Sequence, residues 1–378
     1  MWGEGRRWWR CMGGGLGVGL MVVWVVRVCL ILTITLLMLL VSLLLKNRIT
    51  LQEADASIPV QANVYAFKEA LEASVGVSGD SGKSSVKVLP GCPSTPPHLV
   101  GEVKVEESVT VKEAEARHGA SVKYGGFSWP EHCEARWSVA IIVPYRDREH
   151  QVGAFLNHMH PFLQRQQLNY SIYFVEQDGT ELFNRARLLN VGFLESHKEG
   201  PWDCYAFHDV DMLPENDYHL YHCSAQPRHL AVATSNNKYR SSHGILYHTY
   251  YGGACLMGEG HIRKVNGWSN IYWGWGGEDD DMWRRITFAD MAVWRYPAHF
   301  AKYKMIKHKR QIVNEDRYKI LKRNTGRYPY DGLKNLNYTI KTVTRHPLYT
   351  HILVDIGSSS AQDDPTNKKF SGHNNKKT

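Results

Sequence analysis

YAFHDVD, residues 205–211, decides the fold, because a short apolar run ends there in two carboxylates. Residues two apart on an extended strand face the same side, so Asp209 and Asp211 can point together from the end of a strand. In open α/β sheets, ligands bind at the carboxyl ends of the strands. A hard divalent cation holding a diphosphate suits such a pair, whereas helix capping or a turn is the ordinary structural alternative.

Two further apolar runs precede this one and have the composition of buried strands. They are VAIIVPY at 139–145 and YSIYFVEQ at 170–177. Helical stretches at 155–166 and 185–195 separate the three runs. This alternation predicts an α/β domain with a mixed, mostly parallel sheet flanked by helices.

Basic side chains follow the first two predicted strands. Arg146 and Arg148 come directly after the first, and Arg185 follows Phe183 after the second. A guanidinium fork suits phosphate, although an arginine on a loop is more often simply solvated. Two such sets at strand ends favour an anionic ligand at this edge of the sheet.

A glycine- and tryptophan-rich segment, YWGWGGEDDD at 272–281, is the second chemical feature. Three glycines between aromatic residues predict a mobile loop, and the four acidic residues begin a helix. Carboxylates stabilise a helix N-terminus, which is a structural reason for them but not for the tryptophans. A carboxylate beside a sugar hydroxyl can act as a general base.

Met305 and His308 form a third feature. An imidazole is a common metal ligand, but a thioether is an unusual companion for oxygen donors. Residue chemistry alone therefore gives this pair little weight.

The N-terminal region predicts a membrane anchor. Residues 28–45 are eighteen in number and carry no charge, which fits a membrane-spanning helix, and an apolar stretch from residue 16 leaves the start of the span open. Three arginines within the first ten residues favour a cytoplasmic segment at 1–27 and a translocated remainder. A cleavable signal peptide is the alternative, but no small-x-small site follows closely.

Composition divides the remainder of the chain. Residues 46–121, rich in Gly, Ser, Pro and charge, predict a flexible lumenal stem, and residues 122–357 a folded domain. Residues 358–378 are polar and predict a disordered tail. The net charge of +8 is compatible with a nucleotide diphosphate, and the absence of a dense basic stripe excludes a nucleic-acid partner.

Cysteines and sequons agree with an oxidising compartment. Seven cysteines are present without a CxxC pair, and five of them follow the predicted span. Two disulfides and one buried thiol suit that number. N-x-S/T sequons at Asn169 and Asn337 are candidate N-glycosylation sites.

Taken together, these segments resemble the β-1,4-galactosyltransferase family. The longest matching stretches are FNRARLLNVGF at 183–193, HDVDMLPENDYHLY at 208–221 and NGWSNIYWGWGGEDDDMWRRI at 266–286. WGWGGEDDD is the most specific of the motifs, and the resemblance covers roughly residues 91–357. Shorter matches are QPRH at 226–229, YYGG at 250–253 and RHPLYTHILVDIG at 345–357.

The resemblance implies a GT-A fold and a Mn²⁺-dependent, inverting reaction. UDP-galactose would donate galactose to the 4-hydroxyl of a terminal N-acetylglucosamine on glycoproteins or glycolipids. GGEDDD differs from the GREDDE-like pattern of the xylose-accepting branch, which favours this hexosamine acceptor. The family also implies a single-pass type II Golgi membrane protein whose catalytic domain, 122–357, is lumenal.

Site residues follow from matching positions in the motifs. The implied metal ligands are Asp211, Met305 and His308. For Met305, the position in the motif outweighs the low weight that its chemistry alone gives it. Asp279 is implied as the catalytic base, with Glu278 as the second catalytic residue. The implied donor contacts are Pro144, Arg146, Arg148, Phe183, Arg185, Val210, Asp211, Tyr250 and Trp275. The implied acceptor contacts are Gly277, Glu278, Asp279, Asp280 and Arg317, and the implied disulfides are Cys92–Cys133 and Cys204–Cys223.

Donor choice is expected to depend on Tyr250. Members of the family that use galactose carry Tyr there, whereas users of N-acetylgalactosamine have a smaller aliphatic residue. A phenol ring occupies the space that an N-acetyl group needs.

Alternatives remain open at this point. They are an N-acetylgalactosaminyl- or N-acetylglucosaminyltransferase acting on the same acceptor class and a non-catalytic carbohydrate-binding protein. The sequence does not decide whether the chain forms a homodimer. Two departures from the family are His208, where several relatives have Ser, and a shorter stretch from His308 to Arg317.

Overall fold

The part of the chain that the structure covers belongs to one compact unit, Gln61–Thr378. The predicted cytoplasmic segment, the predicted membrane span and most of the predicted tail lie outside it or outside the described residues. Among the described helices, none has the length and apolar content needed to cross a membrane. The computed structural model describes residues 89–239, 246–308, 311–324 and 326–359.

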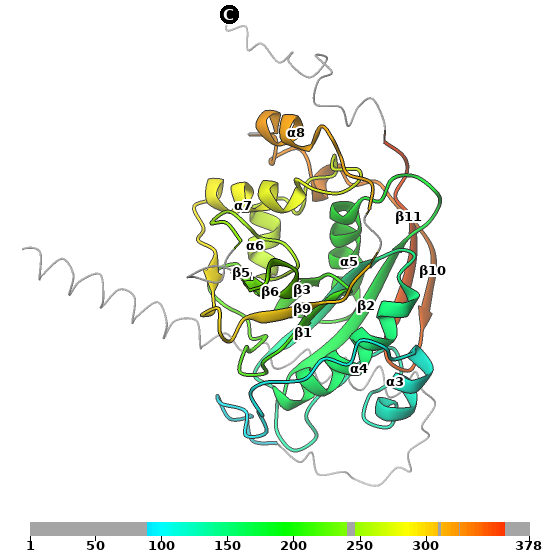
Figure 1. Cartoon of the computed structure of the whole chain (residues 1–378), viewed down its shortest axis with the longest axis vertical. Coiled ribbons are helices and arrows are strands. Elements are labelled where there is room, and N and C mark those ends of the chain that lie inside the picture. The colour runs from blue at the N-terminus through cyan, green and yellow to red at the C-terminus, as the bar shows by residue number, and fades with distance from the viewer. Residues whose placement is uncertain (1–88, 240–245, 309–310, 325, 360–378) are drawn as a thin grey trace, which may run out of the picture. The chain divides into compact units, whose positions relative to one another are not determined.

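A mixed eight-stranded sheet runs through this unit (Figure 1). Strands β11, β2, β1 and β3 are parallel neighbours, and antiparallel pairs flank them at β10–β11 and β3–β7. The prediction of a mixed sheet is confirmed. Across the sheet the order is β10 (Thr339–Arg345), β11 (Thr350–Asp355), β2 (Asn169–Gln177), β1 (Ser138–Tyr145), β3 (Cys204–His208), β7 (Ala254–Gly258), β5 (Arg228–His229) and β8 (Trp294–Arg295).

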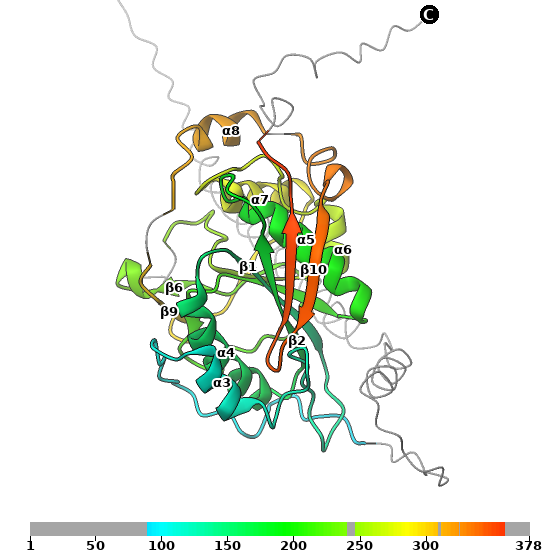
Figure 2. The same cartoon turned by 90° about the vertical axis from the view of Figure 1, so that its right-hand side faces the viewer.

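Helices cover both faces of this sheet. Figures 1 and 2 show α3 and α4 on one face, and α5, α6 and α7 on the other. A smaller sheet, β4–β9–β6, lies beside the large one. The remaining elements are α3 (Val111–His118), α4 (Glu149–Arg165), α5 (Arg185–Glu199), β4 (Met212–Pro214), β6 (Ala233–Thr234), η1 (Ser235–Asn237), α6 (Glu259–Lys264), α7 (Glu278–Phe288), β9 (Lys302–Met305), α8 (Arg317–Arg323) and η2 (Leu333–Asn335).

The central strand β1 shows why the sheet is buried on both faces. All of its residues are buried. Because side chains alternate along a strand, Ile141 packs into the core shared with α4, whereas Ile142 packs into the core shared with α5. This two-sided burial explains a continuous apolar run rather than an alternating one.

The predicted border between stem and domain at residue 122 was wrong. Residues 89–121 pack on the domain and contain α3, which begins with a capping box between Thr110 and Glu113. Asp217 is fully buried and accepts hydrogen bonds from the amides of Val100 (3.0 Å) and Gly101 (2.8 Å). The polar composition of residues 89–121 predicts a flexible segment, but contacts with residues more than 100 positions away fix it on the domain.

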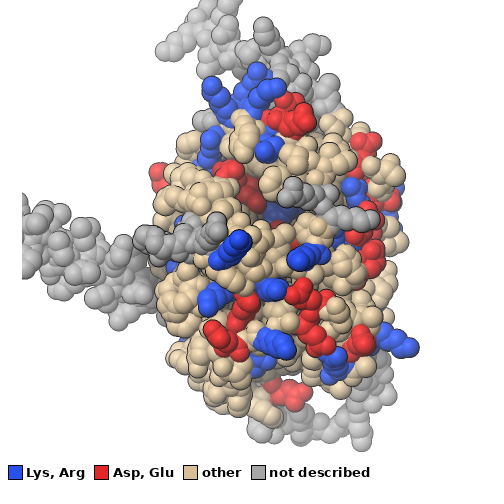
Figure 3. Space-filling view, in the orientation of Figure 1, with Lys and Arg blue, Asp and Glu red and all other residues tan. Residues whose placement is uncertain are grey.

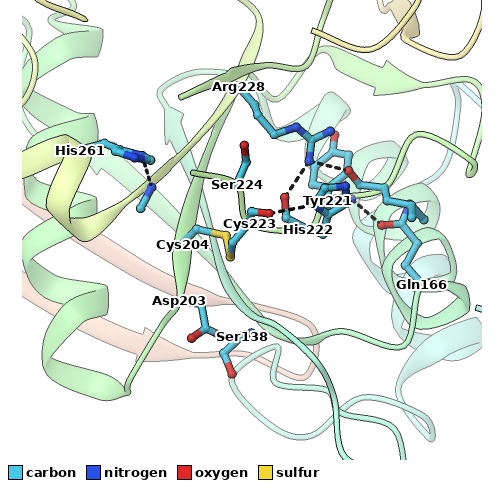
Figure 4. Close-up of a disulfide and its surroundings, with 12 residues drawn as sticks. Ser138, Gln166, Asp203, Cys204, Tyr221, His222, Cys223, Ser224, Arg228 and His261 are labelled. Carbon is cyan, nitrogen blue, oxygen red and sulfur yellow. Dashed lines mark hydrogen bonds between the residues drawn. A yellow bond between two sulfur atoms is a disulfide. The ribbon is translucent and has the colours of Figure 1, made fainter. Parts of the chain in front are cut away.

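Both implied disulfides are present, Cys92–Cys133 and Cys204–Cys223, and the free thiol of Cys255 is buried. Figure 4 shows the second disulfide, which ties the segment before β5 to β3. Nearby, Arg228 donates hydrogen bonds to the carbonyls of Leu220 (2.9 Å) and His222 (2.7 Å). These contacts hold that segment against the end of the sheet.

The two sequons differ in their surroundings. Asn169 begins β2, is half-buried and donates a hydrogen bond to Ser138 Oγ (3.0 Å), and Ser171 of the same sequon is fully buried. Asn337 is exposed in the loop before β10. The accessible sequon in the folded domain is therefore Asn337, and its glycosylation stays a prediction.

Candidate active site

A cleft of about 490 Å³ opens beyond the carboxyl ends of β1 and β3. It brings together every residue that the sequence assigned to the metal, the donor or the acceptor. The lining includes Pro144, Arg146, Arg148, Phe183, Arg185, Val210, Asp211, Tyr250, Trp275, Gly277, Glu278, Asp279, Asp280, Met305, His308 and Arg317.

Arg185, the first residue of α5, is the centre of the charged part of the cleft. Its Nε donates to Asp209 Oδ1 (2.6 Å) and its Nη1 donates to Asp279 Oδ1 (3.0 Å). Glu278 Oε1 lies 3.8 Å from the same Nη1. The guanidinium also lies over the Trp268 ring. One cation is thus surrounded by three carboxylates, one directly after β3 and two in the first turn of α7.

This crowding changes the proton affinity of the carboxylates. Burial, followed by the charges of Glu278, Asp209 and Asp280, raises the pKa of Asp279 well above its usual range, and Arg185 opposes this only partly. Burial also raises the pKa of Asp209 to about 6 and that of Glu278 above its ordinary value. A carboxylate with a raised pKa is a better proton acceptor near neutral pH.

Glycines shape the loop that leads to Asp279. Gly274, Gly276 and Gly277 all have positive φ, which other residues rarely adopt. Gly277 is the N-cap of α7, so Glu278 and Asp279 lie in its first turn. An added Cβ at Gly252 would overlap the Asp279 carboxylate, so only glycine lets that backbone approach it.

The implied metal ligands meet where β4 pairs with β9. Asp211 precedes β4, Met305 ends β9, and the Ile306 amide donates to the Asp211 carbonyl (2.8 Å). His308 Nε2 lies 2.8 Å from Asp211 Oδ2. The described residues contain no group of three or more His, Cys, Asp and Glu placed to hold a metal. The carboxylate and the imidazole fit a first-row divalent cation, whereas the thioether would be a weak third ligand.

One part of the cleft is basic. Arg146 donates to the Glu181 carbonyl (2.8 Å), and its guanidinium lies 5.5 Å from the centre of the Phe183 ring. An adjoining hollow of about 810 Å³ shares Arg146, Arg148, Phe183 and His308 with the cleft and adds Lys307. On the face of the molecule drawn in Figure 3, positive and negative side chains are mixed.

Another part of the cleft is aromatic. The Trp275 side chain is 56% exposed at the rim. Its backbone pairs with the segment before α8, since the Trp275 amide donates to the Ile312 carbonyl (2.8 Å) and its carbonyl accepts from the Asn314 amide (3.1 Å). The Arg317 guanidinium lies 5.9 Å from the Trp275 ring centre and 4.5 Å from that of Tyr318. Stacked side chains of this kind suit the apolar face of a sugar.

Some of the lining residues were not assigned a role from the sequence. Asp209 was considered only with Asp211, yet it is the closest partner of Arg185. Tyr247 and Tyr318 were missed, although both are exposed aromatic residues next to assigned positions. Tyr247 lies close before Tyr250 and Tyr318 directly follows Arg317, so nearness in the sequence to an assigned residue could have identified both.

Comparison with known proteins places these features in context. Residues 92–224 match the family model described as the N-terminal region of glycosyl transferase group 7, and residues 228–309 match the model described as the N-terminal domain of galactosyltransferase. Beta-1,4-galactosyltransferase 4 of Cricetulus griseus is 45% identical over 272 residues, which are 71% of this chain and 77% of the relative. Beta-1,4-galactosyltransferase 3 of Rattus norvegicus is 44% identical over 288 residues, 75% of this chain and 72% of the relative.

A solved structure is also similar. It is the catalytic domain of Drosophila beta1,4-galactosyltransferase 7 in complex with xylobiose. Its sequence is 30% identical, the TM-score is 0.51, and the alignment covers 58% of this chain and 94% of that structure.

Proposed function

The chain belongs to the β-1,4-galactosyltransferase family, and from this membership we propose that it is a UDP-galactose-dependent glycosyltransferase with a GT-A-like fold. It transfers galactose to the 4-hydroxyl of a terminal N-acetylglucosamine on glycoproteins or glycolipids, with inversion. The observation that carries the proposal is the Asp279–Arg185 pair beside Asp211 and His308 in one cleft.

Asp211, Met305 and His308 hold Mn²⁺ in this proposal. When bound, the cation neutralises the charge that develops on the leaving diphosphate. Arg146 and Arg148 bind the phosphates from the basic side of the cleft, since their guanidinium groups match phosphate oxygens.

Asp279 is the base. Its carboxylate takes the proton of the acceptor 4-hydroxyl while that oxygen attacks the anomeric carbon of galactose. The bond from the anomeric carbon to UDP breaks, and its electron pair leaves with UDP. Attack from the opposite face inverts the anomeric centre. Arg185 orients the Asp279 carboxylate, and the negative charge of Glu278 makes it more basic.

Different residues of the cleft select the acceptor and the donor. Gly277, Asp280 and Arg317 contact the acceptor, and closure of the loop that carries Trp275 over the donor excludes water that would hydrolyse it. We assign a hexosamine acceptor from the GGEDDD motif, although the similar solved structure holds xylobiose. Tyr250 excludes donors with an N-acetyl group. An N-acetylgalactosaminyltransferase is the alternative, distinguished by its donor.

The setting in the cell is part of the proposal. The apolar run at 28–45 and the arginines before it support a single-pass type II membrane protein with a lumenal catalytic domain, and Golgi residence follows from the resemblance to the family. The two disulfides suit an oxidising lumen. Formation of a homodimer stays untested.

Asp279→Asn tests the mechanism. The full chain in membranes is offered UDP-galactose and N-acetylglucosamine with Mn²⁺, and kcat is expected to fall about 10²–10⁴-fold because the amide cannot accept the proton. UDP binding, measured by calorimetry, should remain, which shows that the variant is folded. Removal of the metal with a chelator should abolish transfer by the unmodified protein. Near-normal kcat in Asp279→Asn would exclude Asp279 as the base.

A further inference from the structure

The backbone segment that carries Tyr250 is held by two side chains from neighbouring strands. Arg295, on β8, donates from Nη2 to the carbonyls of Tyr250 (2.8 Å) and His248 (3.1 Å). His229, on β5, has its Nε2 2.9 Å from the carbonyl of Gly252. Three carbonyls of this short segment are therefore bound from one side. We call Arg295 and His229 the carbonyl clamp.

The two members of the clamp also bind each other. Parallel pairing of β5 with β8 places His229 opposite Arg295, and Arg295 Nε donates to His229 Nδ1 (3.2 Å). A carbonyl only accepts, so His229 Nε2 carries the proton that is donated to Gly252, which leaves Nδ1 free to accept. Burial lowers the pKa of His229 to about 3 and keeps its ring in this neutral form. Every polar atom of the imidazole is satisfied in a single directed chain.

The clamped segment lies against both functional groups of the cleft. The His229 ring packs edge-on against the Tyr250 ring, with centroids 5.0 Å apart. A Cβ at Gly252 would lie 2.8 Å from Tyr250 Cε2 and would overlap the Asp279 carboxylate. A shift of this backbone therefore changes the space beside Tyr250 and the approach to Asp279.

We propose that Arg295 and His229 are positioning residues for donor selection. They act through Tyr250, because they hold its backbone and ring where an N-acetyl group on the donor sugar would have to fit. This inference rests on the proposed function, in which the Tyr250 ring excludes such donors. Without the clamp, the segment can retreat from the cleft, and donors that carry an N-acetyl group gain access.

The test compares two donors in the full chain. The quantity measured is kcat/KM for UDP-N-acetylgalactosamine divided by kcat/KM for UDP-galactose. We expect Arg295→Met to raise this ratio about 5-fold or more, since even small changes in pocket volume alter selectivity by about tenfold. Arg295→Lys keeps a group that can donate a hydrogen bond to the carbonyls, so it should raise the ratio less than Arg295→Met does. If Arg295→Met does not fold, Arg295→Lys serves as the test.

Two comparisons separate positioning from a general loss of structure. The single variant Tyr250→Leu should raise the ratio. Adding Arg295→Met to Tyr250→Leu should then change the ratio less than about 2-fold, because both changes act through the Tyr250 ring. Arg228→Lys is the matched control: Arg228, also on β5, binds the carbonyls of Leu220 and His222, outside the segment. It should lower the melting temperature without changing the ratio.

An unchanged ratio in both Arg295 variants, with a lower melting temperature as in Arg228→Lys, would overturn the proposal. The proposal would also be overturned if Arg295→Met changed the ratio by the same factor in the unmodified protein and in Tyr250→Leu. Failure of the proposed function is recognised separately. If the proposed function is wrong, the unmodified protein transfers neither sugar. If the role of Tyr250 is wrong, the single variant Tyr250→Leu leaves the ratio unchanged.

Discussion

At the scale of single residues, four consecutive acidic side chains at the start of α7 have different surroundings. Asp281 points into the fold, where it accepts from Arg285 Nε (2.6 Å). Glu278 and Asp279 face Arg185 in the cleft. Asp280 is half-buried like Asp279, but the cation that acts on it is Arg284. A helix turns about 100° per residue, so the four side chains leave the helix in different directions, and Asp281 points away from the cleft that Glu278 and Asp279 face. This rotation separates the structural carboxylate of Asp281 from that of Asp279, the proposed base.

The raised pKa of Asp279 leads to a prediction about pH. Burial and the charge of Glu278 hold this pKa well above its ordinary value of 3.8, and a base works only when it is deprotonated. Activity is therefore present above the Asp279 pKa and is lost as the pH falls through it. Glu278→Gln removes a neighbouring negative charge and should move this acid limb to lower pH. The measurement is kcat/KM for UDP-galactose between about pH 5 and 9. An acid limb that Glu278→Gln leaves in place would contradict the assignment.

At the scale of elements, the contact between α4 and the segment leading into α3 depends on one glycine. A Cβ at Gly153 would overlap the backbone at Val109 and Thr110. The helix can approach that backbone only because residue 153 has no side chain. The same contact helps to explain why α4 begins at Glu149, before the predicted start at residue 155. Its first turns are buried by tertiary neighbours rather than by a regular apolar pattern.

Gly153→Ala should destabilise the domain. The added methyl group must push the helix from its partner backbone, and we expect a loss of about 1–3 kcal/mol in the free energy of unfolding. Gly260→Ala, in α6, is the matched control, since an added Cβ there has no neighbour within 4 Å. That change should stabilise the domain by about 0.5–1 kcal/mol. Denaturant unfolding of the two variants measures the difference, and equal effects would show that the close approach at Gly153 carries no energy.

At the scale of the whole domain, residues 89–121 complete the structure rather than connect it to the membrane. Cys92 is bonded to Cys133, which closes a loop of sequence separation 41. Asp217 is fully buried and depends on the amides of Val100 and Gly101 in addition to Arg165 (2.6 Å). A buried carboxylate that loses its hydrogen-bond donors is strongly destabilising.

Two soluble fragments test this point. A fragment that starts at Gly91 should keep the melting temperature and UDP binding of the domain. One that starts at Val122 lacks the disulfide, worth about 2–4 kcal/mol, and leaves Asp217 without its amide donors at a further cost of about 1–3 kcal/mol. It should melt at a much lower temperature. Equal melting temperatures of the two fragments would show that residues 91–121 belong to the stem and do not stabilise the domain.

The sequence was sufficient for the central strands and for the start of α5, and the residues that it assigned to the metal, the donor and the acceptor all line one cleft. Strands β1 and β2 were predicted within one residue, since burial on both faces requires an unbroken apolar run, and the site residues stand in short motifs at element ends. Tertiary structure alone decided three other features. They are the order of residues 89–121, the separate roles of the four α7 carboxylates, and the clamp of Arg295 and His229, which are 66 residues apart. Patterns in a sequence report neighbours within a few residues, whereas these features depend on partners that only folding brings together.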